Sequence, residues 1–194
     1  MLIDLINQGN EACYKHYVEP HTPNFTRVTL EDKDFERIRQ RAKCIIEKKR
    51  TEIQNLNDSG SMLKRWVTGW CGERVVEKYL GIEFMDLSIG ESYSYNTPDL
   101  LPAGFRVGVK TCNILDFPLM KPPTASNICI PEIFVIKEDK NNYLVAGIGD
   151  YEVLNNAKNY TRLLVRSSAV QHKQAFYRFD LLKHRFDLND LEIA

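Results

Sequence analysis

Three polar side chains near the middle of the chain have the types needed for metal-assisted hydrolysis of a phosphodiester bond. Glu73 lies in the helix-like segment GWCGERVVEKYLG, and Asp99 and Lys110 lie in the hairpin-like segment NTPDLLPAGFRVGVKTCN. Mg²⁺ is a hard cation that prefers oxygen ligands, and a nearby ammonium can steady the attacking water or the developing negative charge. If the helix and the hairpin pack together, these groups can converge on one point.

The segment around Glu73 is predicted to be a helix. Apolar residues recur at spacings of three and four from Trp66 to Leu80, and Gly81 follows at the position of a helix C-cap. Glu73 and Glu77 are four residues apart, so both can project from one side of this helix.

The segment around Lys110 is predicted to be a hairpin with a type I turn over residues 101–104. The apolar residues Phe105, Val107 and Val109 alternate after the turn, which places Lys110 on the opposite face of the strand. We expect Asp99 on the strand that precedes the turn.

In this order, Gly72-Glu73, Pro98-Asp99 and Lys110 resemble the signature of the PD-(D/E)xK nuclease superfamily, over about the middle quarter of the chain. The resemblance implies a restriction-endonuclease-like fold, with Asp99 as a metal ligand, Glu73 in contact with the metal and Lys110 orienting the nucleophilic water. It also implies Mg²⁺ as the cofactor, for which Mn²⁺ can substitute, and DNA as the partner.

The sequence departs from this signature at one position. The second acid should stand where Gly108 stands, and glycine has no side chain to offer. Members of the superfamily supply that carboxylate from elsewhere, so Glu73, Glu77 or Glu91 can stand in, with the Val109 carbonyl as a further metal ligand.

The departure leaves two functions open. The first is a metal-dependent endodeoxyribonuclease of a restriction-like or phage type. The second is a catalytically inactive module on the same fold that binds nucleic acid or protein. A Ser-His-Asp or Cys-His hydrolase is disfavoured, because the chain has no GxSxG segment and no cysteine motif.

A concentrated basic surface is predicted on a helix from about Glu31 to Gln54, with Thr29 as its N-cap. Between Glu36 and Arg50 this segment holds seven Lys or Arg residues and two Glu, an excess of five positive charges. Such a helix can lie along a phosphate backbone, and a solvated helix face explains the pattern equally well. The polar segment 167–175, for which a helix surface is slightly favoured, offers amides and cations that could contact bases. The candidate nucleic-acid-binding residues are Arg37, Arg41, Lys48, Lys64, Arg65, Gln171 and Lys173.

The composition indicates one globular domain. The chain has 194 residues, of which 43% are hydrophobic, and its 26 basic residues balance 26 acidic ones, so net charge does not point to a polyanionic partner. Five widely spaced cysteines without a CxxC pair favour a reducing cytoplasm. We expect no membrane-spanning segment and no signal peptide, and a homodimer is a further expectation from the resemblance.

The order of the predicted elements indicates an α/β (α+β) fold with a mixed central β-sheet flanked by helices. A single nuclease domain would then comprise a helical N-terminal portion (1–60), a catalytic core (61–150) and C-terminal helix and strand elements (151–194). The expected strands are FTRVTL, residues 82–87, residues 127–137 with a bulge or edge at Pro131, residues 143–148 and residues 163–165, and further helices are expected at 2–17 and 151–160.

Overall fold

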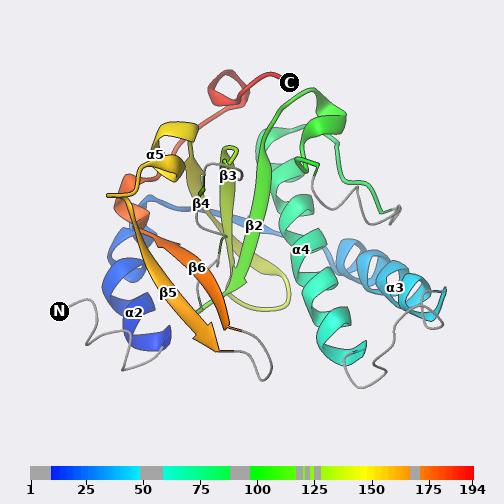
Figure 1. The fold of residues 1–194 in the computed structure, drawn as a ribbon. Helices are drawn as coiled ribbons and strands as arrows, with labels where there is room; N and C mark the ends of the chain where they lie inside the picture. Colours follow the sequence, from blue (N-terminus) through cyan, green and yellow to red (C-terminus); the bar gives the residue numbers. More distant parts are fainter. Residues whose placement is uncertain are drawn as a thin grey trace.

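The computed structural model describes residues 10–48, 59–87, 97–116, 120, 123–124, 128–166 and 171–194, with only the backbone at some positions, including 48, 161–166 and 171–176 (Figure 1). Its helices are α2 (Asn10–Tyr17), α3 (Asp32–Lys48), α4 (Ser59–Leu80) and α5 (Tyr151–Asn155). Its strands are β1 (Thr26–Thr29), β2 (Gly108–Asn113), β3 (Glu132–Lys137), β4 (Asn142–Gly149), β5 (Tyr160–Arg166) and β6 (Gln171–Tyr177). Short 3-10 turns lie at Glu19–Asn24, Leu101–Ala103, Phe179–Leu181 and Leu188–Asp190.

The central sheet has four strands in the order β1-β4-β3-β2. β2 and β3 are parallel, whereas β3 with β4 and β4 with β1 are antiparallel. This confirms the predicted mixed sheet with flanking helices. β5 and β6 form a separate two-stranded antiparallel ribbon.

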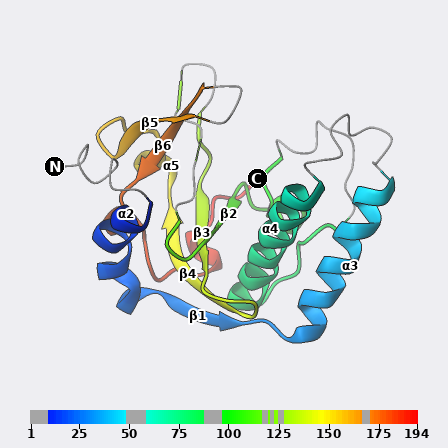
Figure 2. The ribbon, with the colours of Figure 1, turned by 90° about the horizontal axis from the view of Figure 1, so that it is seen from below.

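Two hydrophobic cores cover the two faces of the sheet. Successive residues of a strand point to opposite faces, so in β3 the residues Ile133 and Val135 belong to the first core, while Phe134 and Ile136 belong to the second. The first core packs against α3 and α4, and the second packs against α2, α5 and the base of the ribbon. Figure 2 shows α3 and α4 on one side of the sheet and α2 with the ribbon on the other.

Helix α4 confirms the predicted helix around Glu73. It ends at Leu80, and Gly81 has a φ of 70°, the left-handed conformation that glycine adopts at a helix C-terminus. The composition of residues 57–61 (NDSGS) predicts a break between helices, but α4 already begins at Ser59, so this prediction is wrong for residues 59–61. Within the described residues, no helix is long and apolar enough to cross a membrane.

Thr29 is not the N-cap of the basic helix, because it is the last residue of β1. Its hydroxyl donates to Asn142 Oδ1 over 2.9 Å, and the next N–H group, that of Leu30, donates to the Asn141 carbonyl. Helix α3 therefore starts later, at Asp32. The continuation predicted toward Gln54 lies outside the described residues beyond residue 48, as do residues 2–9 of the first predicted helix.

Residues 82–87 do not form the expected strand. The N–H groups of Phe84 and Met85 donate to Glu77 Oε1 over 2.7 and 2.6 Å, so a helix side chain takes the place of a neighbouring strand. Pro131 does not bulge a strand, because β3 begins only at Glu132.

Near the C-terminus, the helix expected over 151–160 is shorter than predicted. α5 ends at Asn155, and Tyr160 already begins β5. The helix surface favoured for residues 167–175 is also wrong from Gln171 onward, because those residues form strand β6.

Candidate active site

Asp99 lies beside the open edge of the sheet. It is in a turn rather than on the predicted strand, and its Oδ2 accepts the N–H of Val109 over 2.6 Å. The N–H of Gly108 donates to the Pro131 carbonyl on the β3 side. Because backbone groups alternate in direction along a strand, the N–H and carbonyl of Val109 point away from β3, and β2 is the outermost strand there. The Val109 carbonyl thus faces the same edge as Asp99.

A glutamate from the neighbouring strand fills the space that Gly108 leaves. Glu132 is the register partner of Gly108 in the parallel β2–β3 pair. A Cβ atom built on Gly108 would lie 2.8 Å from Glu132 Cδ and 3.1 Å from Oε1. The carboxylate missing from position 108 is therefore present in space, although it comes from 24 positions further along the chain.

Glu132 and Lys110 form an ion pair at this point. Lys110 Nζ lies 3.3 Å from Glu132 Oε1, and Glu132 is 6% exposed. Its other oxygen, Oε2, is buried without a hydrogen-bond partner. Burial raises the pKa of Glu132 to about 7, although the Lys110 charge acts against this shift. Burial alone would lower the pKa of Lys110, but Glu132 and Asp99 outweigh it and keep the ammonium charged.

Glu73 joins this group from α4. Gly72 brings the helix against β2, since a Cβ atom there would lie 2.9 Å from Thr111 Cβ. Burial, followed by the charges of Asp99 and other nearby acids, raises the pKa of Glu73 to about 8, while Lys110 acts in the opposite direction. The three residues predicted to converge are therefore close enough to influence one another's charge.

The donor set has the chemistry that Mg²⁺ requires. Asp99, Glu132, Glu73 and the Val109 carbonyl supply oxygen atoms only, which hard cations prefer. Among the described residues, no three His, Cys, Asp or Glu side chains are arranged to hold a metal ion as they stand. Burial is the largest cause that raises the pKa of Asp99, Glu73 and Glu132, and a cation bound beside these carboxyls and the unpartnered Glu132 Oε2 would favour their charged forms.

Glu77 has a structural role in this arrangement. Its Oε1 accepts the N–H groups of Phe84 and Met85, and its Oε2 accepts a hydrogen bond from Arg74 over 2.8 Å. Oε1 therefore holds the segment after α4 and Oε2 is paired with Arg74 on α4 itself, so neither oxygen is free to replace the acid missing at Gly108. Glu91, the other candidate, lies outside the described residues.

The predicted nucleic-acid-binding residues are spread over several elements. Arg37 on α3 and Lys64 and Arg65 on α4 are exposed. Arg41 is partly buried and donates to the Leu87 carbonyl over 2.9 Å, so it anchors the segment after α4. The side chains of the three remaining residues, Lys48, Gln171 and Lys173, lie outside the described part of the structure.

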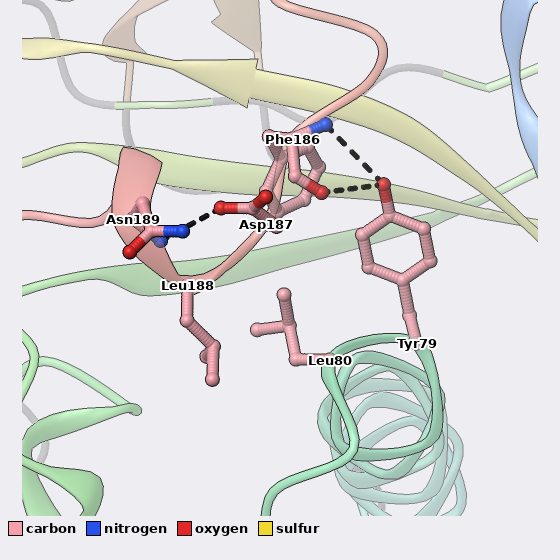
Figure 3. A pocket seen from close by; sticks show the side chains of 6 residues that line it. All are labelled: Tyr79, Leu80, Phe186, Asp187, Leu188 and Asn189. Atoms are coloured by element: carbon pink, nitrogen blue, oxygen red, sulfur yellow. Dashed lines mark hydrogen bonds between the residues drawn. The ribbon is translucent and has the colours of Figure 1, made fainter.

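A pocket of about 280 Å³ lies elsewhere, between the C-terminal end of α4 and residues 186–189 (Figure 3). The Tyr79 hydroxyl donates to the Phe186 carbonyl, and the Asn189 N–H donates to Asp187 Oδ1. Figure 3 shows Leu80 and Leu188 beside these polar groups. None of the site residues lines this pocket, so the acid and lysine group is the stronger candidate for chemistry.

Comparisons of the chain with family models, with curated proteins and with solved structures found no match.

Proposed function

We propose that this protein is a metal-dependent endonuclease that hydrolyses phosphodiester bonds in DNA. The observation that carries the proposal is the position of Glu132, which stands over Gly108 and pairs with Lys110 at 3.3 Å. With Asp99 at the adjoining edge, two carboxylates and one ammonium are held together, as metal-assisted hydrolysis requires. DNA follows from the resemblance of Glu73, Asp99 and Lys110 to the PD-(D/E)xK signature.

Each residue has a distinct role in the proposed reaction. Asp99 and Glu132 would hold Mg²⁺ together with the Val109 carbonyl, and Glu73 would contact it from α4. The bound ion would supply Lewis acidity and a water of lowered pKa. Lys110, charged at neutral pH, orients the attacking water and offsets negative charge on the phosphate oxygens in the transition state.

Plasmid cleavage tests this proposal. Supercoiled and single-stranded DNA are incubated with Mg²⁺, Mn²⁺ or EDTA and the wild-type protein or the variants Asp99→Asn, Glu132→Gln and Lys110→Met. We expect metal-dependent cutting by the wild type and a loss of roughly 100-fold or more in each variant. Glu152→Gln, at an exposed position of α5, is the matched control and should cut normally.

Circular dichroism of each variant separates loss of chemistry from loss of fold. Full activity of a folded Glu132→Gln protein would show that Glu132 is not part of the active site. No metal-dependent cutting of either DNA by the wild type would refute the nuclease proposal itself.

An inactive binding module on the same fold is the second candidate. It is favoured by the closed Lys110–Glu132 ion pair and by the lack of a ready three-ligand cluster among the described residues. Calorimetric titration with Mn²⁺ distinguishes the two candidates. If the protein is a nuclease, the wild type should bind Mn²⁺ and Asp99→Asn should abolish this binding. If it is an inactive module, the wild type should not bind Mn²⁺.

A further inference from the structure

The first half of α4 extends beyond the strand that it packs against. Gly72 lies against Thr111 of β2, and residues 59–71 precede it in the helix. These residues span about 20 Å along the helix axis, whereas β2 runs only from Gly108 to Asn113. Figure 1 shows this part of α4 continuing past the end of β2. Beyond Gly72, β2 therefore leaves one side of the helix uncovered.

This uncovered side leads along the helix to the candidate active site. Gly69 lies three residues before Gly72 and four before Glu73, and Arg65 lies four before Gly69, so these residues share a face. Among the described residues, nothing lies within 4 Å of a Cβ atom built on Gly69. The helix backbone is therefore open between Arg65 and Glu73, over an axial distance of about 12 Å. A DNA strand covers that distance with about three or four nucleotides.

Two cations stand at the start of this open side. Lys64 and Arg65 are exposed, and neither forms an ion pair with another described residue. The sequence from Ser59 to Gly72 contains no Asp or Glu, so no acid in this stretch balances their charge. Exposed cations without local acids attract an anionic chain such as a phosphate backbone.

Trp66 adds an aromatic surface next to these cations. Its ring centroid lies 6.1 Å from that of Trp70, which is 8% exposed, at an interplanar angle of 37°. Trp66 itself is only partly buried, and it packs against the first core. The core therefore holds the ring in place while part of the side chain faces solvent. A fixed, partly exposed aromatic ring of this kind can stack on an unpaired base.

We propose that single-stranded DNA binds next to the cutting site on one surface of α4, formed by Lys64, Arg65, Trp66 and Gly69. We call this surface the α4 track. The two cations contact phosphates, Trp66 stacks on one base, and the bare backbone at Gly69 lets the strand lie close to the helix on its way to Glu73. This inference rests on the proposed function, which supplies DNA, and adds the strandedness of the substrate. The bases of a duplex are already stacked on their neighbours, so a duplex has no free base for Trp66.

Binding without metal tests the α4 track. Fluorescence anisotropy of a labelled single strand and of its duplex is measured in EDTA, so that the result does not depend on cutting. The wild type should bind the single strand more tightly. Trp66→Leu should weaken single-strand binding by roughly 5–100-fold, the loss expected for one stacked base, without changing its salt dependence.

The cations should affect the salt dependence instead. Lys64→Gln/Arg65→Gln should lower the slope of log K against log salt by about 1.4, or about 0.7 for each lost phosphate contact of a single strand. Arg27→Gln/Lys33→Gln is the matched control. It removes two exposed cations elsewhere and should keep the wild-type slope.

Gly69→Gln separates binding from stability. The new side chain would enter open space, and glutamine favours a helix more than glycine does, so the melting temperature should not fall. The same side chain would obstruct the strand, and single-strand affinity should therefore fall by about fivefold or more. Gly69→Ala, with a much smaller side chain, should lose less affinity.

Tryptophan emission reports the stacking directly, because the chain has only two tryptophans, Trp66 and Trp70. Addition of single-stranded DNA should quench the emission of the wild type and of Trp70→Phe. It should leave the emission of Trp66→Phe unchanged.

The results distinguish a failure of the track from a failure of the nuclease. Unchanged single-strand affinity in folded Trp66→Leu and Gly69→Gln proteins, or tighter binding of the duplex by the wild type, would overturn the track even if metal-dependent cutting stands. Single-strand binding that depends on Trp66 and Gly69, without cutting under any metal, would support the track and refute the nuclease. If Trp66→Leu does not fold, the affinity of Gly69→Gln and the emission of Trp70→Phe decide the outcome.

Discussion

Replacing Gly108 with alanine directly tests how Glu132 is seated. The added methyl group would lie 2.8 Å from Glu132 Cδ and closer still to Oε2, well inside ordinary contact distance. A glutamate at the surface could swing away from such a clash. Glu132 is 6% exposed and ion-paired with Lys110, so it can move only by opening the pair or shifting β3 against β2.

Overpacking of this kind costs about 1–3 kcal/mol of unfolding free energy. We therefore expect Gly108→Ala to lower stability by that amount and to reduce metal-dependent cutting, because the carboxylate loses its place beside Lys110. Urea unfolding followed by far-ultraviolet circular dichroism gives the stability, and plasmid cleavage gives the activity.

A double variant makes the test specific. In Gly108→Asp/Glu132→Ala the clash is removed and a carboxylate returns to the strand that carries Lys110. The double variant should be more stable than the sum of the two single changes by about 0.5–3 kcal/mol, and it should regain part of the cutting lost in Glu132→Ala. Two results would refute the described position of Glu132 over Gly108. The first is a stability change of the double variant that equals the sum of the two single changes, and the second is a Gly108→Ala protein as stable and active as the wild type.

Three further perturbations test the surroundings of the site. The pKa of Glu73 in the folded protein, about 8, is above its ordinary value of 4.5. Its contribution to the unfolding free energy is therefore fully present below pH 4.5 and is lost as the pH rises through about 8. Urea unfolding without metal should show this decline in the wild type, and Glu73→Gln should flatten it. Glu77→Gln should lower the unfolding free energy by about 2–4 kcal/mol by weakening buried charge-assisted hydrogen bonds, while its cutting keeps the same metal dependence; unchanged stability would contradict the structural role. Gly72→Ala should destabilise the protein by about 1–3 kcal/mol, because the added methyl group would clash with Thr111. Gly69→Ala is the control and should be neutral or stabilising, because, among the described residues, nothing lies within 4 Å of its added methyl group. Equal melting temperatures of the two variants would exclude the close approach of α4 to β2.

Local patterns predicted the elements that carry the site. The apolar spacing along α4 and the glycine after it gave the helix, and alternation after Val107 gave the direction of Lys110. Both depend on interactions within a few residues. The sequence also brought Glu73, Asp99 and Lys110 together through their order in the chain, and the structure places them within electrostatic reach of one another.

Glu132 was missed because its position depends on strand register rather than on sequence spacing. A parallel strand pair joins residues that are far apart in the chain, and here it puts Glu132 beside Gly108. One signal was present, since Glu132 is the one acid in the apolar run ICIPEIFVIK. A charge inside a buried strand breaks the local pattern, and such breaks concentrate at functional sites.

The wrong predictions share a physical cause. Thr29 has the type of an N-cap and residues 82–87 have the composition of a strand, but tertiary partners overrode both preferences. Asn142 pairs with Thr29 in the sheet, and Glu77 binds the N–H groups that a strand neighbour would have taken. These partners are distant in sequence or belong to a helix, so no local pattern reveals them.

The parallel pairing of β2 and β3 also governs when the site can exist during folding. β3 and β4 are joined by a tight turn and can pair early, but β2 must close onto β3 across a connection of residues 114–131. Lys110 and Glu132 therefore meet only after this non-local step. In a chain that has formed the β3–β4 hairpin but not the β2–β3 pair, Lys110 and Glu132 are still apart. The ion pair forms only when β2 completes the sheet.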